Sequence, residues 1–400
     1  MAVLKVAILG FGTVGEGAYR TIISHGDELA GVLGKKVEVA AVLIRNKQKK
    51  RDIAPDVLLT TDFEEILQLP QLDIVIEAIV DKEPTFTYLK QAIERGCHII
   101  TANKEMFAHH GSELQELAEK NNVSIGFEAT VAGGIPVIQT LRQLLKINRV
   151  QQIQGILNGT SNFILTEMRE KQHSFAESLA QAQKNGYAEA DPTNDVEGFD
   201  AFYKTMILSR IAFGEEPEWP KVERVGITGI TSELIDAATK LDLRFKHVAS
   251  LSKEAGQIKA SVKPVLVGNE HPFYHVEGVE NAVNVYSDIV GRITLQGPGA
   301  GMFPTASAVI EDLVYVYQNR SARKKYAQTT TEYCEQNEEK KQELWLVQGL
   351  HDILPTVTII DEVGNGIRVI KAAKSDLEQL ESIRYFAILG EVEQKEAVVV

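Results

Sequence analysis

The feature that most constrains the fold is a glycine-rich turn close to the N-terminus. Residues 4–9, LKVAIL, form a short and mostly apolar run that predicts a buried β-strand. Gly10, Gly12 and Gly15 follow directly in the pattern G-x-G-x-x-G, and we expect a helix to begin near Gly15. In this context Gly10 permits a tight turn, Gly12 lets the backbone approach a pyrophosphate, and Gly15 allows close helix–strand packing. The pattern predicts dinucleotide binding, and a glycine turn in an unrelated α/β fold is the alternative.

Strand-like and helix-like segments continue to alternate after this turn. The predicted strands cover residues 37–44, 73–80, 98–101 and 123–127, and the predicted helices cover residues 84–95 and 112–120. Such alternation indicates a doubly wound parallel sheet, which binds ligands at the carboxyl ends of its strands. Lys104 closes one of the predicted strands, so we expect it to point into a cofactor crevice.

The residues after the second predicted strand are basic. An NAD-selective site usually has an acidic residue here, where it binds the ribose hydroxyls. In this chain Arg45 ends the strand, and further basic residues follow: Lys47, Lys49, Lys50 and Arg51. Because arginine can pair with a 2′-phosphate through two hydrogen bonds, the sequence favours NADP, with NAD still possible. A solvated basic loop is the alternative.

A cluster of acidic residues and one lysine lies within residues 186–214. The acidic residues are Glu189, Asp191, Asp195, Glu197 and Asp200, and the lysine is Lys204. Asp200 and Lys204 are four residues apart, so on a helix they share one face, which continues into apolar residues. The pair either supports a surface helix or lies at the edge of a cleft in which pKa values are tuned for acid–base chemistry. Spacing alone leaves both interpretations open.

Residues 128–136, EATVAGGIP, form another unusual segment. Its small residues and the pair Gly133-Gly134 predict an irregular turn with exposed carbonyl groups. The Glu128 carboxylate together with several carbonyl oxygens suits a hard cation. A plain hinge between domains is the alternative, and the residues by themselves favour the hinge.

From Ile135 onward the pattern becomes mixed, with predicted strands at residues 150–157, 258–267, 281–286 and 292–295. Residues 297–305 form a second glycine turn, and the apolar helix after it is expected to return to the first domain. A charged stretch at residues 319–325 resembles a linker. After it, residues 344–348, 356–360, 367–371 and 385–389 are strand-like, and residues 376–383 are helical. We therefore predict an α/β protein with a discontinuous nucleotide-binding domain (1–134 and 298–320), an α+β substrate-binding and dimerisation domain (135–297) and a small C-terminal βα module (326–400).

Composition narrows the class of protein. The chain has 400 residues, of which 44% are hydrophobic and 24% charged, as expected of a globular protein with two or three domains. A net charge of −13 argues against general nucleic-acid binding, and no apolar run is long enough to cross a bilayer. The N-terminus enters a strand directly, so we expect no signal peptide. Cys97 and Cys334 give no disulfide framework, which suits the cytoplasm.

Six motifs, in this order, resemble those of the homoserine dehydrogenase family. They are GFGTVG at 10–15, TANK at 101–104, FEATVAGGIP at 127–136, GILNGTSNFIL at 155–165, GYAEADPTNDVEGFDAFYK at 186–204 and GPGAGMFPTASAV at 297–309. The resemblance covers roughly residues 3–320. It implies a Rossmann-type domain, a homodimer or higher homo-oligomer, and interconversion of L-aspartate 4-semialdehyde and L-homoserine with NAD(P)H. That reaction belongs to threonine, methionine and isoleucine biosynthesis.

The resemblance also implies roles for individual residues. Lys204 matches the family's general acid–base lysine, Asp200 its partner, and Lys104 the second lysine of the site. The implied substrate-binding acids are Glu189, Asp195 and Asp200. The implied cofactor contacts are Phe11, Gly12, Thr13, Val14, Arg45, Lys104 and Gly301. A sodium-like cation site is implied at Glu128 with the carbonyl groups of Val131, Gly133 and Ile135, which reverses the preference for a plain hinge.

The C-terminal region departs from the family pattern. Many relatives end in an ACT domain that senses an amino acid. Here the usual aspartate–proline–glycine–valine entry to the first ACT helix is missing, and residues 352–355, DILP, are at most a degenerate relic of it. The module is either a degenerate ACT-like unit or a dimerisation element.

Two competing functions remain for comparison. Aspartate-semialdehyde dehydrogenase chemistry needs a cysteine nucleophile in the second domain, and neither Cys97 nor Cys334 lies there. A non-catalytic dinucleotide sensor with a C-terminal regulatory module would be favoured by loss of Lys204 or of the acidic cluster, and both are present.

Overall fold

The computed structural model describes residues 2–254, 256–319, 342–350, 354–380 and 383–390. The chain divides into two compact units, each discontinuous in sequence. The first unit comprises Met1–Arg149, Met206–Glu215 and Gly297–Thr329, and the second comprises Val150–Thr205, Glu216–Gln296 and Thr330–Val400. The predicted linker at 319–325, apart from Asn319, lies outside the described residues.

A six-stranded sheet in the order β3-β2-β1-β4-β5-β6 forms the centre of the first unit. Every pairing in this sheet is parallel, which confirms the predicted doubly wound sheet. The strands are β1 (Val3–Leu9), β2 (Lys36–Leu43), β3 (Leu58–Thr60), β4 (Ile74–Glu77), β5 (His98–Thr101) and β6 (Ile125–Gly126). Strand order reverses between β1 and β4, and this is the point at which such sheets bind ligands.

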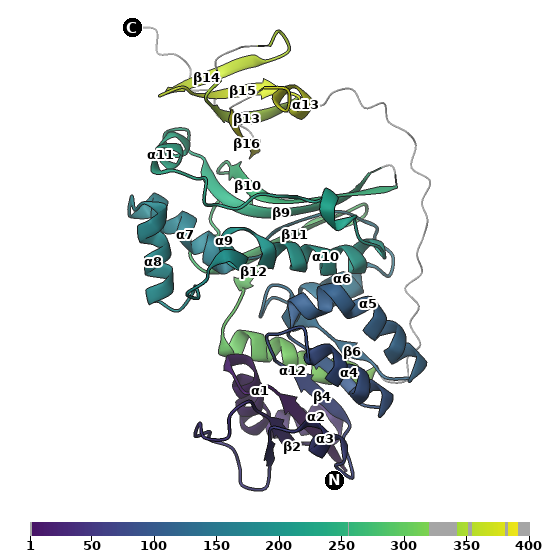
Figure 1. Cartoon of the computed structure of the whole chain (residues 1–400). Helices are drawn as coiled ribbons and strands as arrows, with labels where there is room; N and C mark the ends of the chain where they lie inside the picture. Colours follow the sequence, from purple (N-terminus) through teal and green to yellow (C-terminus); the bar gives the residue numbers. More distant parts are fainter. Residues whose placement is uncertain (1, 255, 320–341, 351–353, 381–382, 391–400) are drawn as a thin grey trace. The chain divides into compact units, whose positions relative to one another are not determined.

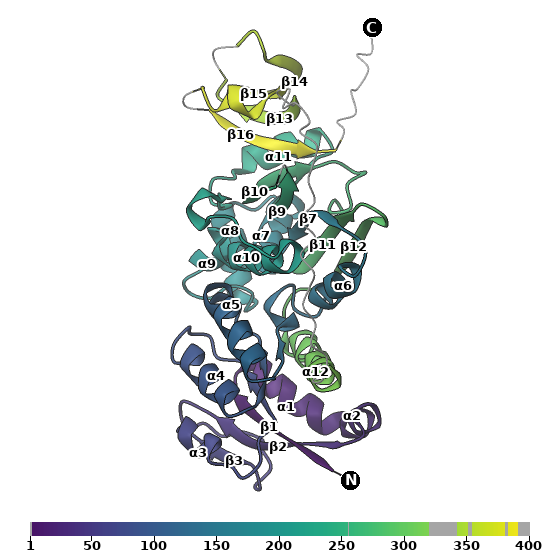
Figure 2. The same ribbon diagram turned by 90° about the vertical axis from the view of Figure 1, so that its right-hand side faces the viewer.

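Helices cover both faces of this sheet, with α1, α2 and α12 on one side and α4 and α5 on the other (Figure 2). The helices of the unit are α1 (Thr13–Ser24), α2 (Gly26–Leu33), α3 (Phe63–Leu67), α4 (Thr85–Glu94), α5 (Lys104–Lys120), the short η1 (Glu128–Thr130), α6 (Val137–Leu144) and α12 (Met302–Gln318). One apolar core joins β1 and β2 to α1, α2 and α12. The segment after residue 297 is therefore part of the nucleotide-binding fold.

Several elements of this unit differ from the sequence prediction; strand β4, for example, ends at Glu77 rather than at residue 80. Helix α5 begins at Lys104 rather than Ser112, because the Asn103 side chain accepts a hydrogen bond from the Met106 N–H at 3.0 Å and caps the helix. Lys104 is thus the first residue of a helix, not the last of a strand. Strand β6 spans only Ile125–Gly126, because η1 begins at Glu128.

The second unit is built on a mixed sheet of ten strands (Figure 1). Nine of them follow the order β12-β11-β7-β9-β10-β16-β13-β15-β14, and β8 pairs with β10. The strands are β7 (Val150–Ile156), β8 (Glu223–Arg224), β9 (Arg244–Glu254), β10 (Gln257–Val267), β11 (Glu280–Ser287), β12 (Gly291–Pro298), β13 (Glu343–Gln348), β14 (Thr358–Gly364), β15 (Ile367–Ala372) and β16 (Arg384–Leu389). The remaining elements are α7 (Gly159–Glu170), α8 (Phe175–Lys184), α9 (Thr193–Val196), η2 (Trp219–Lys221), α11 (Ser232–Lys240), α13 (Lys374–Leu377) and α10 (Phe199–Phe213), of which the part from Met206 onward belongs to the first unit.

The C-terminal strands continue this sheet instead of standing apart from it. Strand β16 pairs with β10 in parallel, with Leu266 opposite Ile388. Within the module the strands β13 to β16 lie in the order fourth, first, third, second, as in two interleaved split βαβ units. The predicted helix at 376–383 is wrong in extent, because α13 ends at Leu377 and β16 begins at Arg384.

None of the helices in the described residues is long and apolar enough to cross a membrane.

The contact between α1 and α12 gives a direct test of the first unit. A Cβ atom added at Gly17 would lie 2.6 Å from the Met302 carbonyl oxygen, whereas one at Gly31 of α2 meets nothing within 4 Å. Gly31→Ala should stabilise the protein by about 0.5–1 kcal/mol through helix propensity. Gly17→Ala should instead lower the free energy of unfolding by about 1–2 kcal/mol through overpacking. Denaturant unfolding measures both, and equal stability changes would contradict this packing of α12.

Candidate active site

The glycine turn lies against the ends of three neighbouring strands of the first unit. Gly10 has a φ of +91° and donates its N–H to the Leu43 carbonyl oxygen at 3.0 Å. A Cβ atom at Gly10 would lie 2.6 Å from the Ala78 carbonyl oxygen, so only glycine fits. A Cβ atom at Gly12 would meet nothing within 4 Å. The turn is thus tightly packed at Gly10 and open at Gly12, directly before the N-terminus of α1. Open space next to a helix N-terminus suits a pyrophosphate.

Polar side chains hold the loop that follows β4. The Glu77 carboxylate accepts hydrogen bonds from the Ile79 N–H at 2.6 Å and from the Thr101 hydroxyl at 2.5 Å. Burial raises the pKa of Glu77 to about 8. The Asn103 amide donates to the carbonyl oxygens of Ile79 and Asp81, each at 3.0 Å. Lys104 follows as an exposed residue at the first position of α5.

Arg45 is exposed at the end of β2, as the sequence predicts, but its guanidinium group forms an ion pair with the carboxylate of Asp81. The basic residues after it lie in a loop that is held by internal hydrogen bonds. Within this loop the Arg51 guanidinium group donates to the carbonyl oxygens of Asn46 at 2.8 Å and Lys49 at 2.7 Å. The Asp81 carboxylate therefore offsets the positive charge of Arg45. No pattern in the sequence had indicated that Asp81 would lie beside Arg45. Gly301 is the exposed N-cap residue of α12, with a φ of +122°.

In the second unit, Lys204 and Asp200 form a buried ion pair on α10. The Lys204 Nζ atom lies 2.7 Å from Asp200 Oδ2 and 2.6 Å from the Leu157 carbonyl oxygen. Their side chains are only 10% and 4% exposed, which excludes the alternative of a solvated surface pair. Two charges taken out of water need close partners, and the helix spacing provides the first of them.

The other acids of the cluster differ in exposure and in their hydrogen-bond partners. The Asn158 amide donates to Asp195 Oδ1 at 2.7 Å and to Asp200 Oδ2 at 2.9 Å, so Asp195 lies with the ion pair. Glu189 is exposed, and its carbonyl oxygen accepts a hydrogen bond from Gln183 at 3.0 Å. Asp191 precedes Pro192, the N-cap residue of α9, and its carboxylate accepts a hydrogen bond from the Thr193 N–H at 3.1 Å.

His247 of β9 lies next to Gly198 and close to Asp200. Its Nε2 atom is 2.9 Å from the Val225 carbonyl oxygen, and burial lowers its pKa to about 4, so the ring is neutral at physiological pH. A Cβ atom at Gly198 would lie 2.9 Å from the ring, so the turn that starts α10 packs on the histidine. Strand β9 was not predicted from the sequence, and with it this contact was missed.

Glu128 begins η1 and is almost fully buried. Its carboxylate oxygens accept hydrogen bonds from the N–H groups of Ile138 at 2.7 Å and Gln139 at 2.8 Å, which caps α6. Burial and the neighbouring Asp312 raise the pKa of Glu128 to about 8. Each carboxylate oxygen keeps a second acceptor site, and the turn to Ile135 adds backbone carbonyls, so this all-oxygen set is compatible with a hard cation. No cluster of three histidine, cysteine or acidic side chains suited to a metal occurs in the described ranges.

Comparison with known proteins decides the family. Residues 136–314 match a family model described as Homoserine dehydrogenase, and residues 10–128 match one described as Homoserine dehydrogenase, NAD binding domain. The homoserine dehydrogenase of Bacillus subtilis (strain 168) is 37% identical over 401 residues, which cover 100% of this chain and 92% of the relative. The chain belongs to the homoserine dehydrogenase family. It is an oxidoreductase that acts on a CH–OH group with NAD(P).

Solved homoserine dehydrogenases share the fold. A crystal structure from Thiobacillus denitrificans matches with a TM-score of 0.85 and 33% identity, covering 97% of this chain and 99% of that one. A hyperthermophilic archaeal homoserine dehydrogenase in complex with NADPH matches with a TM-score of 0.69 and 28% identity, covering 79% of this chain and 98% of that one. The family resemblance and the Rossmann-type fold predicted from the sequence are both confirmed.

Three side chains that contact candidate site residues or the turn before α10 were not predicted from the sequence: Asn158, His247 and Asp81. Asn158 carries a recognisable signal, because an asparagine between an apolar strand and a helix is a preferred N-cap. No local pattern indicated that its amide would reach residues some forty positions further along the chain, at Asp195 and Asp200.

Proposed function

We propose that this protein interconverts L-aspartate 4-semialdehyde and L-homoserine in threonine, methionine and isoleucine biosynthesis. The observation that carries the proposal is the buried Lys204–Asp200 pair, held at 2.7 Å in a chain of the homoserine dehydrogenase family. A non-catalytic dinucleotide sensor would have no need of a buried lysine held by a carboxylate. The charged pair carries a desolvation cost that catalysis explains.

Lys204 acts as the general acid–base residue. During aldehyde reduction, negative charge develops on the substrate oxygen and needs a proton donor within hydrogen-bond reach. The Lys204 ammonium group, oriented by Asp200 and by the Leu157 carbonyl oxygen, supplies that proton. In the oxidative direction the neutral amine accepts the proton from the substrate hydroxyl. NAD(P)H, when bound, supplies the hydride.

The substrate ammonium group is bound by carboxylates. Glu189 is exposed and so is accessible to a small cationic group, and Asp195 and Asp200 extend the negative charge. Lys104, the second lysine of the family pattern, lies at the junction of cofactor and substrate in this proposal. Its place at the start of α5 keeps its side chain outside the apolar core.

The cofactor is NADP, with NAD possible. The pyrophosphate binds at the glycine turn through Phe11, Gly12, Thr13 and Val14, where open space and helix N–H groups coincide. Arg45 contacts the 2′-phosphate, and Lys104 and Gly301 complete the contacts. The phosphate must compete with Asp81 for Arg45, so Asp81 should weaken the preference for NADP.

A monovalent cation, sodium in our proposal, binds at Glu128 with the carbonyl oxygens of Val131, Gly133 and Ile135. Oxygen ligands from one carboxylate and a backbone turn suit such a hard ion. Because Glu128 also caps α6, the cation would stabilise the segment that connects the sheet to this helix.

The assembly is a homodimer or higher homo-oligomer in the cytoplasm, and the mass in solution from sedimentation tests this. We propose that the C-terminal module is a degenerate ACT-like unit, and α13 is its only helix within the described residues. Residues 352 and 353 of the DILP segment lie outside those residues. Titration of activity with threonine tests whether the module retains a regulatory role.

The decisive experiment concerns Lys204. Lys204→Met keeps the aliphatic side chain and removes the proton donor, so kcat for aspartate semialdehyde reduction should fall by about 10²–10⁴-fold. Lys221→Met is the matched control, because its ammonium group forms an exposed pair with Glu218. NADPH consumption gives the rate, and circular dichroism checks the fold. Unchanged turnover in Lys204→Met would remove the residue from the mechanism, and an inactive wild type that binds NADPH would favour the sensor.

Cofactor preference is tested by changing both partners of the surface ion pair. Arg45→Ala should lower kcat/KM with NADPH about tenfold through loss of a charge-assisted hydrogen bond, and should change NADH turnover little. Asp81→Asn should raise the NADPH/NADH ratio because it removes the competing carboxylate. Lys50→Ala, in the same exposed loop, serves as the control. An unchanged NADPH/NADH ratio in both variants would exclude Arg45 as the selector.

The cation site is tested with sodium and with tetramethylammonium as the sole cation. Wild-type activity should be higher in sodium, because the cation would favour the ionised form of the Glu128 carboxyl group, whereas Glu128→Gln, which cannot ionise, should lose the difference between the two salts. Glu311→Gln changes an exposed acid on α12 and should behave as the wild type. If the wild type is equally active in both salts, no functional cation binds.

A further inference from the structure

The amide of Asn158 joins two elements that carry the acidic cluster. We infer that Asn158 is a positioning residue that holds Asp195 of α9 beside Asp200 of α10 and thereby fixes Asp200 against Lys204. This inference rests on the proposed roles of Asp200 and Lys204. It adds to them a neutral residue outside the acids and lysines of the site.

Every hydrogen-bonding atom of the Asn158 side chain has a partner. Its Oδ1 atom accepts the Ser161 N–H at 2.7 Å and caps α7. Its Nδ2 atom donates to Asp195 Oδ1 at 2.7 Å and to Asp200 Oδ2 at 2.9 Å. A side-chain amide has two N–H donors, so both are used and a flipped amide would lose all three contacts. At 5% exposure, little water is available to replace them.

The junction between β7 and α7 contacts both members of the ion pair. Asp200 Oδ2 accepts hydrogen bonds from Asn158 and from Lys204, while the carbonyl oxygen of Leu157 accepts from Lys204 at 2.6 Å. Two consecutive residues, Leu157 and Asn158, therefore fix the lysine and its carboxylate. A displacement of Asn158 changes the geometry of the pair directly.

A neutral donor also has an electrostatic advantage at this place. Two neighbouring carboxylates disfavour each other's ionisation, and shared N–H donors offset this cost without a further cation that would compete with Lys204. The charged groups that face the amide are Asp195 from α9 and Asp200 and Lys204 from α10. His247 from β9 faces the same cluster and is neutral above about pH 4.

Helix α7 is itself firmly anchored along the side that starts with Asn158. Asn162, one turn later, donates to the carbonyl oxygens of Val276 and Gly278 in the loop before β11 and to that of Glu280, the first residue of β11. Further along, Thr166 donates to Glu277 Oε2 at 2.7 Å.

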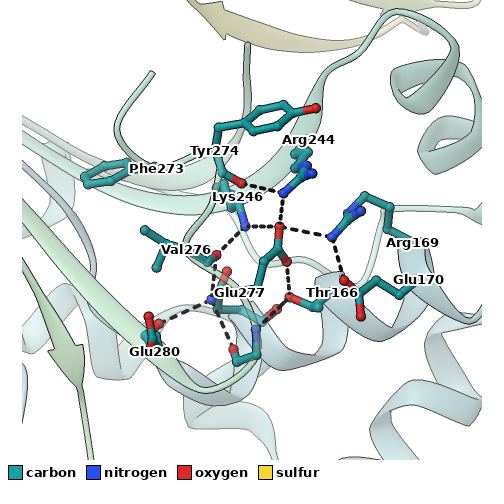
Figure 3. Close-up of polar contacts among 12 residues, drawn as sticks. Thr166, Arg169, Glu170, Arg244, Lys246, Phe273, Tyr274, Val276, Glu277 and Glu280 are labelled. Carbon is teal, nitrogen blue, oxygen red and sulfur yellow. Dashed lines mark hydrogen bonds and ion pairs between the residues drawn. The ribbon is translucent and has the colours of Figure 1, made fainter. Parts of the chain in front are cut away.

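The Glu277 carboxylate completes this anchor (Figure 3). Its Oε1 atom forms ion pairs with Arg169 of α7 at 3.0 Å and, on β9, with Arg244 at 2.7 Å and Lys246 at 3.3 Å. The helix is thereby fixed to β9 and to the loop before β11, so Asn158 starts from a rigid support. A changed cap residue therefore alters the acidic cluster more readily than it moves α7.

The test compares Asn158→Asp with Asn158→Ser. Both residues are good N-caps, so α7 keeps its start, but aspartate puts a third carboxylate against Asp195 and Asp200, and serine is too short to reach them. We expect kcat to fall about tenfold or more in both variants, with a smaller change in KM. In Asn158→Asp alone, the added charge should raise the pH at which homoserine oxidation reaches half its maximum by about one unit, because it stabilises the Lys204 ammonium form. Asn194→Asp, an exposed neighbour of Asp195, is the matched charge control and should leave the pH profile unchanged.

A double-mutant cycle with Lys204→Met separates the inference from the proposed function. If Asn158 acts through the ion pair, Asn158→Asp adds little loss in the Lys204→Met background. An inactive Lys204→Met with a fully active Asn158→Asp and an unshifted pH profile overturns the inference alone. An equal additional loss in both backgrounds also overturns it, since the effect would then be independent of Lys204. A fully active Lys204→Met overturns the proposed role of Lys204 first.

Discussion

The proposed chemistry of the second unit depends on the ion pair between Lys204 and Asp200. Both charges are almost completely removed from water, and such a pair is favourable only when its geometry is good and its other hydrogen-bonding groups are satisfied. The Leu157 carbonyl oxygen and the Asn158 amide provide these partners, and His247 supports the turn from which α10 starts. The junction of β7 and α7, helix α9, strand β9 and helix α10 all contribute to this small polar cluster.

An asparagine with the same two functions, capping a helix and donating to a distant segment, occurs in the first unit. Asn103 caps α5 with its oxygen and donates its amide to the loop after β4, as Asn158 caps α7 and donates to the acids. In both cases an asparagine between a buried strand and a helix satisfies the helix N-terminus and also donates to a distant segment, which is the loop after β4 for Asn103 and the helices α9 and α10 for Asn158. This dual use follows from the side chain, which has an acceptor and two donors at a fixed distance.

Buried carboxyl groups have a structural part in the first unit. Glu77 and Glu128 each accept hydrogen bonds from backbone N–H groups, and burial raises the pKa of both to about 8. Asp312 of α12 accepts the N–H of Glu128 at 2.6 Å, and burial raises its pKa to about 6. These contacts fix the loop after β4 and the start of α6, and they join the C-terminal helix of the unit to the segment that carries the proposed cation ligands.

The sequence by itself determined the features that depend on local pattern. The glycine turn after β1, the alternation of strands and helices, the basic end of β2 at Arg45, and the spacing of Asp200 and Lys204 could all be predicted, because each is set within a few residues. The ordered motifs also identified the family correctly. The tertiary structure decided whether the pair is buried, that Asn158 joins Asp195 to Asp200, and that Arg45 pairs with Asp81. It also decided the course of β9 and the addition of β16 to β10. These contacts join residues tens to more than a hundred positions apart, and they arise from packing that neither periodicity nor local propensity encodes.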